Sequence, residues 1–237
     1  MEEDEVRKLR AWNYRHLHEK SDDCRVELRS VPQRDLRSVM DGVFADLALS
    51  TGLRISEMVS LRWRDVYNCT ERKPKETVNM PARVMKGKKR ARRVLINQTA
   101  AKALDAYYAV WHLLFLDACP PFEDDWLFGV QHSWHFMARK YRAGQAQCPT
   151  TNVGPAGVRT MQKRLGRMFE AAGLTRLAEL SSHSFRKTFC ARVYAATKQD
   201  PSVTMQFTGH ASMNSLQRYL RPTSDAAAAV RRILEST

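Results

Sequence analysis

The sequence has no long apolar run and no leader of the secretory kind. The longest apolar candidate, LLFL at residues 113–116, is far shorter than the about 20 residues that a membrane-spanning helix needs. The first residues, MEEDE, are acidic, whereas a secretory signal begins with basic and then apolar residues. These absences argue against a membrane protein and against export, and we expect a cytoplasmic location.

Disulfide and metal-binding patterns are also missing. The five cysteines are odd in number, widely spaced and without a CxxC pair, namely Cys24, Cys69, Cys119, Cys148 and Cys190. This distribution favours reduced thiols over a disulfide framework or a zinc site. Two histidine pairs, His16 with His18 and His132 with His135, have no convincing third and fourth ligand nearby. We therefore predict no metal and no other cofactor.

Acidic residues are in deficit. The 237 residues include 39 Lys and Arg against 25 Asp and Glu, which gives a formal net charge of +14. Such an excess attracts polyanions, so nucleic acid is the first partner class to consider and a membrane surface the second. At 43% hydrophobic residues, the chain still has enough apolar side chains to bury a core.

Apolar residues recur at helical spacing over several stretches. Residues 34–50 carry an unbroken i, i+3, i+4, i+7 series, which predicts a helix that ends near Gly52 and is followed by a short helix beginning at Arg54. The same periodicity predicts helices around residues 104–115, 158–172 and 185–193, and one amphipathic helix over 6–19. After Pro222, Ser224 or Asp225 can cap a short tail helix over 224–236.

Short β-prone pieces interrupt the helical pattern after Trp63. They begin at Val66 and continue through residues 77–85 and 92–96, with the turn KGKK between the last two. Residues 117–157 contain several Pro and Gly residues and predict a long irregular connection. The predicted fold class is therefore mostly α with a small antiparallel β-sheet, an α+β arrangement.

Four motifs carry side chains with chemical potential, and each is ambiguous alone. Arg54 in TGLRISE follows a helix end, where a guanidinium can be held to bind phosphate, but a solvated arginine looks the same. His183 and Arg186 lie three apart, which puts them on roughly one helix face. His210 in FTGH and Tyr219 in QRYLR would by default be a structural histidine and a core tyrosine.

The densest positive charge lies at residues 83–93, RVMKGKKRARR, with seven basic side chains in eleven residues. This density can follow a nucleic-acid backbone or form a soluble hairpin tip. Beside Lys86, the candidate DNA contacts in this basic stretch are Arg83, Lys88, Lys89, Arg90, Arg92 and Arg93.

Taken in order along the chain, these motifs resemble the catalytic domain of the tyrosine recombinase family, the phage integrase type of site-specific recombinase. The resemblance covers about residues 32–222. The residues that carry it are Arg54, a Lys in a hairpin turn, His183-x-x-Arg186, Gly209-His210 and, nine residues later, Tyr219. It implies DNA strand cleavage and rejoining through a 3′-phosphotyrosine intermediate.

The resemblance also implies a role for each residue at the phosphate. Arg54 and Arg186 would grip the scissile phosphate, because its attack crowds charge onto the phosphoryl oxygens. His210 would hydrogen-bond that phosphate, and Tyr219 would be the nucleophile. Because the phosphotyrosine keeps the ester's bond energy, a second DNA 5′-hydroxyl can rejoin the strands without ATP or metal.

Two proton transfers complete the implied chemistry. His183 would accept the proton of the attacking tyrosine as general base, and Lys86 would protonate the leaving 5′-oxygen as general acid. Lys88 and Lys89 lie in the same turn, so the sequence leaves open which lysine reaches the site. Glu57, in the first motif, corresponds to a supporting rather than a chemical residue.

The chain departs from the family in its N-terminal part. Members usually carry a separate helical DNA-binding domain ahead of the catalytic one, whereas only about thirty residues precede the first firm helix here. We expect residues 1–31 to be a helix and linker and residues 32–237 to be the catalytic domain with its tail helix. Thr208 stands where the family often has an apolar residue.

The expected partners are double-stranded DNA and further copies of the chain, which would assemble as dimers or tetramers on DNA in the nucleoid. The apolar face of the tail helix is too narrow and terminal to be needed by its own core, which favours a partner surface. The resemblance implies that this helix docks on a neighbouring subunit, and the alternative is that it folds back on its own domain. Two other functions stay open. One is relaxation of DNA by a type IB topoisomerase, and the other is DNA binding without catalysis.

Overall fold

The computed structural model describes residues 1–14, 33–80, 91–115, 123–129 and 156–220. The helices and strands in these ranges are α1 (Glu3–Tyr14), α2 (Gln33–Thr51), α3 (Ile55–Met58), α4 (Trp63–Val66), β1 (Tyr67–Asn68), β2 (Lys73–Pro74), β3 (Thr77–Met80), β4 (Arg92–Leu95), α5 (Gln98–Phe115), α7 (Val158–Ala171), α8 (Ser182–Ala196), α9 (Pro201–Thr208) and α10 (Met213–Gln217), with a 3-10 turn η4 at Leu177–Glu179. The prediction of a mostly α fold with little antiparallel β structure is confirmed.

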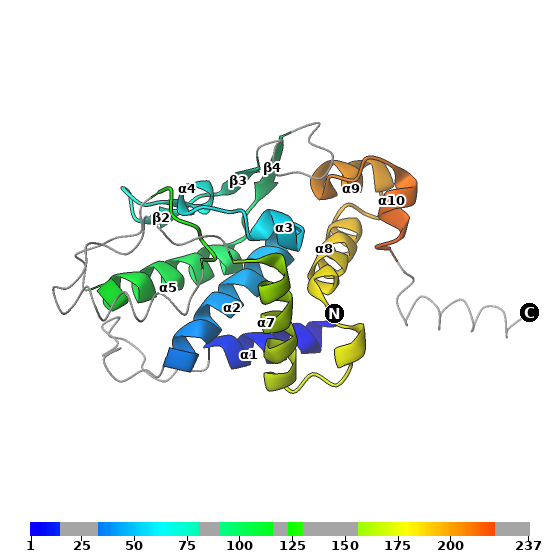
Figure 1. Cartoon of the computed structure of the whole chain (residues 1–237). Helices are drawn as coiled ribbons and strands as arrows, with labels where there is room; N and C mark the ends of the chain where they lie inside the picture. Colours follow the sequence, from blue (N-terminus) through cyan, green and yellow to red (C-terminus); the bar gives the residue numbers. More distant parts are fainter. Residues whose placement is uncertain (15–32, 81–90, 116–122, 130–155, 221–237) are drawn as a thin grey trace, which may run out of the picture.

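Helix α2 lies in the middle of the molecule and contacts α1, α5, α7 and α8 (Figure 1). Its side chains Met40, Val43 and Leu47 are fully buried, and Phe44 is nearly so. The helical spacing of these apolar residues, which predicted a helix over residues 34–50, is therefore the spacing that the core requires. The predicted helices over 104–115, 158–172 and 185–193 are also present, as α5, α7 and α8.

An aromatic cluster joins α4 and β1 to α5. The Trp63 ring stacks on Tyr107 with centroids 5.2 Å apart, and the Tyr67 ring stacks on Tyr108 at 4.5 Å. Residues 123–129, which belong to the predicted irregular connection, pack against the same region, because the Leu127 amide donates to the Leu61 carbonyl at 2.9 Å. Leu127 is fully buried, so this piece of the connection is part of the core.

The β structure differs from the single small sheet that the sequence predicted. β1 pairs with β2, β3 pairs separately with β4, and both pairs are antiparallel and two-stranded. Val66 was expected in a strand but is the last residue of α4. The helical spacing of three residues lets Trp63 and Val66 bury their side chains together, and both are fully buried. The KGKK turn lies outside the described residues.

Helix α1 packs on α2 rather than standing apart. Val6 and Leu9 are buried in the same hydrophobic core as α2. Asp46 on α2 accepts hydrogen bonds of 2.8 Å from Arg10 Nε and from the Tyr14 hydroxyl. The helix begins three residues before the predicted start, and residues 15–19 of that prediction lie outside the described part of the chain. The predicted tail helix over 224–236 lies outside it as well.

In the described ranges, no helix combines the length and the apolar character that crossing a bilayer requires.

Candidate active site

Arg54 is held at the start of α3 by a buried carboxylate. The glycine before it, Gly52, ends the α2 segment with a φ of +59°, a left-handed conformation that favours glycine. The Arg54 amide donates to Glu57 Oε2 at 2.7 Å, and an Arg54 Nη atom donates to Glu57 Oε1 at 2.9 Å. Glu57 is fully buried, whereas 27% of the Arg54 side chain is exposed. The carboxylate therefore fixes a guanidinium that still faces outward.

Arg186 lies at the centre of the site and is almost fully buried, with 1% exposed. It is on the second turn of α8, which begins after the cap Ser181, whose hydroxyl accepts from the His183 amide. One Nη atom of Arg186 donates to the Gly52 carbonyl, and the other lies 3.1 Å from the Thr208 carbonyl oxygen. This arginine thus ties together the end of α2, helix α8 and the end of α9.

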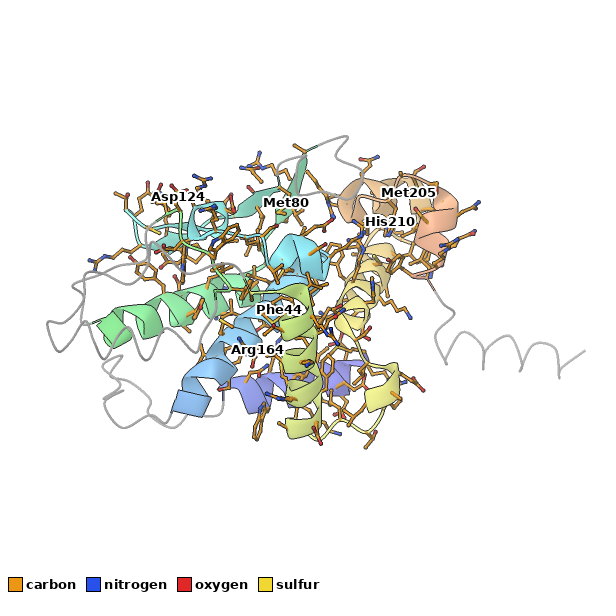
Figure 2. The ribbon with its side chains drawn as sticks, in the orientation of Figure 1. Phe44, Met80, Asp124, Arg164, Met205 and His210 are labelled. Carbon is orange, nitrogen blue, oxygen red and sulfur yellow. The ribbon has the colours of Figure 1, made fainter. Side chains whose placement is uncertain are left out.

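His210 lies in the segment between α9 and α10, where Figure 2 labels it. Its Nε2 is 3.3 Å from an Nη atom of Arg186, and its Nδ1 is 2.8 Å from the Thr208 hydroxyl. Burial, followed by the positive charges of Arg186, Arg54 and Arg92, lowers the pKa of His210 to about 4. The imidazole is therefore neutral at neutral pH.

Arg92, the first residue of β4, also reaches this site. Its Nη2 atom donates to the Phe207 carbonyl at 2.5 Å, next to the Thr208 carbonyl that Arg186 uses. Its side chain lies over Gly209, where a Cβ atom would come within 2.9 Å of Arg92 Nε. Burial, followed by the nearby Arg186 charge, lowers the pKa of Arg92 to about 10, so the guanidinium remains protonated at neutral pH.

Tyr219 lies beside this cluster. Its ring centroid is 4.9 Å from that of His210, and the Cζ atom of Arg186 is 5.5 Å from the Tyr219 ring centroid. Tyr219 follows α10 in a turn, with its amide donating to the Leu216 carbonyl at 2.8 Å. Leu216 is fully buried, so the end of α10 that leads into this turn is held against the protein.

The charges in the site do not balance. Three guanidinium groups, on Arg54, Arg92 and Arg186, influence the titration of His210, and within the described ranges the only ion pair they form is that of Arg54 with Glu57. The Nε atoms of Arg92 and Arg186 are buried and have no hydrogen-bond acceptor among the described residues. Buried cations that lack anionic partners are costly, so this arrangement is suited to binding an anion.

The structure brings together five of the predicted site residues, which are Arg54, Arg92, Arg186, His210 and Tyr219, although Arg92 was predicted only as a DNA contact. His183, on the first turn of α8, is exposed, and the described part of the chain offers its side chain no hydrogen bond. Arg93 is exposed and donates from Nε to the Thr77 hydroxyl at 3.0 Å. The remaining predictions, Arg83, Lys86, Lys88, Lys89 and Arg90, lie outside the described residues.

Sequence reasoning missed two residues that shape the site. Thr208 was treated only as a departure from a family pattern, yet its hydroxyl is the partner of His210 and its carbonyl accepts from Arg186. Gly52 supplies the other carbonyl to Arg186, and a Cβ atom there would lie 2.1 Å from Phe189 Cδ1. Both residues lie inside the motifs TGL and FTGH, and this was the signal that the sequence offered for them.

The described ranges contain no cluster of three or more His, Cys, Asp or Glu residues that could hold a metal ion. The histidine pairs considered from the sequence, His16 with His18 and His132 with His135, lie outside those ranges.

Comparison with known proteins gives the following relatives. Residues 25–225 match the model of the phage integrase family. A search of curated proteins gave no match. Among solved structures, XerA recombinase is 18% identical with a TM-score of 0.60, covering 97% of this chain and 61% of that chain. XerH site-specific recombinase, bound to difH substrate in a pre-cleavage complex, is 16% identical with a TM-score of 0.58, covering 99% of this chain and 54% of that chain. The chain thus spans little more than half the length of these chains, and the likeness is one of fold.

Proposed function

The chain belongs to the phage integrase family, and from this premise we propose that it cleaves and rejoins DNA strands through a covalent 3′-phosphotyrosine on Tyr219. The observation that carries the proposal is the position of the Tyr219 ring beside both Arg186 and His210. Family membership implies DNA breakage and rejoining in general. The site supports the choice of nucleophile.

Arg54 and Arg186 bind the scissile phosphate in this proposal. The attack of a phenolic oxygen on a phosphodiester increases the charge on the non-bridging oxygens, and fixed cations lower the free energy of that transition state. Arg186 is held by two backbone carbonyls and Arg54 by Glu57, so neither guanidinium needs to reorganise when the phosphate arrives. The Nε atom of Arg186 is buried and has no acceptor among the described residues, so this guanidinium keeps an unused donor.

His183 and Lys86 carry the two protons. His183 accepts the proton of the Tyr219 hydroxyl as the oxygen–phosphorus bond forms, and Lys86 protonates the 5′-oxygen as its bond to phosphorus breaks. In the reverse step a DNA 5′-hydroxyl attacks the phosphotyrosine, and the same two groups return the protons. The sum of the two steps conserves the number of phosphoester bonds, so the proposal needs neither ATP nor a metal ion.

His210 acts on Arg186 before DNA binds and on the phosphate afterwards. In the described arrangement Nε2 accepts from Arg186, so it has no proton to give to a phosphate oxygen. A hydrogen bond to the phosphate requires that Nε2 gains a proton once the DNA anion is present. The negative charge of the phosphate favours this change, because it stabilises the imidazolium.

The partner in this proposal is double-stranded DNA. The formal charge of +14 and the basic stretch at 83–93 suit a polyanion, and XerH is a relative whose structure was solved with its DNA substrate. We further propose assembly of dimers or tetramers on paired sites, with the tail over 224–236 docking on a neighbouring subunit. The cytoplasm, where the nucleoid lies, would be the place of action.

The test is covalent capture. Duplex sites selected from a random library for binding would be nicked just downstream of the cleavage position. The short fragment that leaves with a free 5′-hydroxyl then diffuses away, and the 3′-phosphotyrosine adduct accumulates. Wild-type protein should give a protein–DNA band that survives denaturation, and Tyr219→Phe should bind with similar affinity but give no band. An adduct with Tyr219→Phe, or none with wild type, would contradict the proposal. Plasmid relaxation without strand exchange would instead indicate a topoisomerase.

A further inference from the structure

Arg92 was expected only as one of several backbone contacts in the basic stretch, but its position is different. It lies on the first position of β4 and reaches across to the end of α9, where its Nη2 atom donates to the Phe207 carbonyl at 2.5 Å. Arg186 donates to the next carbonyl, that of Thr208, at 3.1 Å. Two guanidinium groups from distant parts of the chain are therefore held by consecutive peptide oxygens.

Hydrogen bonding leaves much of the Arg92 guanidinium unused. Its Nε is buried without an acceptor in the described part of the chain, and the bond to Phe207 uses one of five N–H donors. A peptide carbonyl carries only a partial charge, so it does not neutralise a guanidinium. Among the described residues, the carboxylate at the site is that of Glu57, which is already paired with Arg54.

Gly209 makes the close approach of Arg92 feasible. Its φ of +68° is the left-handed conformation that ends α9, and a Cβ atom there would lie 2.9 Å from Arg92 Nε and 3.0 Å from its Cδ. Any other residue at 209 would place a Cβ atom in the space that the Arg92 side chain occupies. The glycine of the FTGH motif thus serves both the backbone turn and the packing of this arginine.

We infer that Arg92 is a third anion-binding residue of the site, whose guanidinium contacts the same DNA phosphodiester as Arg54 and Arg186. The inference rests on the proposed function for the identity of the anion. The neighbouring Arg93 points to the other face of the strand, where it is exposed and bonded to Thr77, so alternation along β4 separates a site residue from a surface residue.

The first experiment needs no DNA. Inorganic phosphate should raise the melting temperature of the wild-type protein above its value in chloride at equal ionic strength, because binding to the folded state stabilises it. Arg92→Ala should lose at least half of this rise, as should Arg54→Ala. Arg7→Ala, which removes an equal charge from an exposed position on α1, should keep it. A full rise in Arg92→Ala would overturn the inference.

The second experiment uses the covalent adduct. Arg92→Ala should slow adduct formation by about a hundredfold, with a loss of duplex affinity of about tenfold or less. Arg92→Lys, which keeps the charge but loses the planar guanidinium, should form the adduct at a rate between those of wild type and Arg92→Ala. If Arg93→Ala slowed adduct formation as much as Arg92→Ala, the loss of any positive charge on β4 would explain the effect. The inference would then be wrong.

A duplex with an uncharged linkage at the scissile position distinguishes phosphate binding by Arg92 from simple support of residues 207–210. With a methylphosphonate at the scissile position there is less charge to neutralise, so the Arg92→Ala defect should shrink to less than tenfold against wild type on the same duplex. An undiminished defect would show that Arg92 only holds the segment in place.

If wild type forms no adduct at all, the proposed function fails, and the inorganic phosphate experiment alone decides the role of Arg92. Should Arg92→Ala not fold, Arg92→Gln takes its place in each experiment.

Discussion

The Nε2 atom of His210 lies 3.3 Å from an Nη atom of Arg186, and the histidine must be the acceptor in this pair. Arginine has donors only, so the hydrogen of the neutral imidazole sits on Nδ1 and is donated to the Thr208 hydroxyl. That hydroxyl in turn donates to the Thr204 carbonyl at 2.9 Å. The chain of donors thus fixes both the tautomer of His210 and the direction of Arg186.

This network predicts a pH dependence of stability. In the unfolded chain His210 titrates near its ordinary pKa of about 6.5, whereas in the folded protein burial lowers its pKa to about 4. Between these values the unfolded state binds more protons, so the free energy of unfolding rises with pH. The contribution of His210 to the free energy of unfolding is complete above pH 6.5 and is lost as the pH falls to about 4.

Comparison with His210→Gln isolates this group. The free energy of unfolding of wild type should rise by about 2 kcal/mol more than that of the variant between pH 4 and 6.5, a value below the full linkage figure because solvent screens part of the effect. Asp46, whose pKa is raised by burial, works in the opposite direction but is common to both proteins. Urea unfolding across this range measures the difference, and parallel curves would contradict the assignment.

Arg54→Ala should have a structural and a chemical effect that can be separated. Removing the guanidinium leaves the buried Glu57 carboxylate with the Arg54 backbone amide as its only partner in the described part of the chain, which should lower the free energy of unfolding by about 2 to 3 kcal/mol. Glu57→Gln added to Arg54→Ala should restore part of that stability. Adduct formation should be lower by about 10² to 10³ in both variants, because the phosphate ligand is gone in each.

The measurements are urea unfolding and the rate of covalent capture on one duplex. Recovery of the capture rate together with stability in the double variant would show that Arg54 acts only through folding.

Gly52→Ala should disturb the site although it changes no functional group. The new Cβ atom would lie 2.1 Å from Phe189 Cδ1, and alanine does not favour a φ of +59°. We expect a loss of about 2 to 4 kcal/mol in the free energy of unfolding, together with slower adduct formation, because the Gly52 carbonyl that receives Arg186 would move.

Gly166→Ala is the matched control, since it lies within α7 and a Cβ atom there meets nothing within 4 Å. It should be more stable than wild type by about 0.5 to 1 kcal/mol. Similar losses in the two variants would point to a general intolerance of glycine substitution.

Lys86→Ala should slow cleavage by about 10² to 10⁴ if it is the general acid. A duplex with a 5′-bridging sulfur has a leaving group that needs no proton, so this substrate should restore the rate of the variant. Lys88→Ala, in the same turn, should show neither the defect nor the rescue. A defect that sulfur does not relieve would remove Lys86 from this role.

Local patterns accounted for much of what the sequence could predict. The 3.6-residue period of buried side chains predicted α2, α5, α7 and α8, because a helix that packs on a core must place apolar residues on one face. Where a segment was short, the local signal was ambiguous. Val66 has a β-branched side chain that suits a strand, but burial beside Trp63 placed it at the end of a helix.

The sequence by itself determined which motifs are present and in what order, and this order was enough to predict the family and Arg54, Arg186, His210 and Tyr219 as a group. Only the tertiary structure decided how they are held. The contacts of Arg186 with Gly52 and of Arg92 with Phe207 span 134 and 115 residues, and no local periodicity encodes contacts over such separations. Arg92 and Arg93 are adjacent and chemically identical, and they differ only because one face of β4 meets the end of α9 while the other faces solvent.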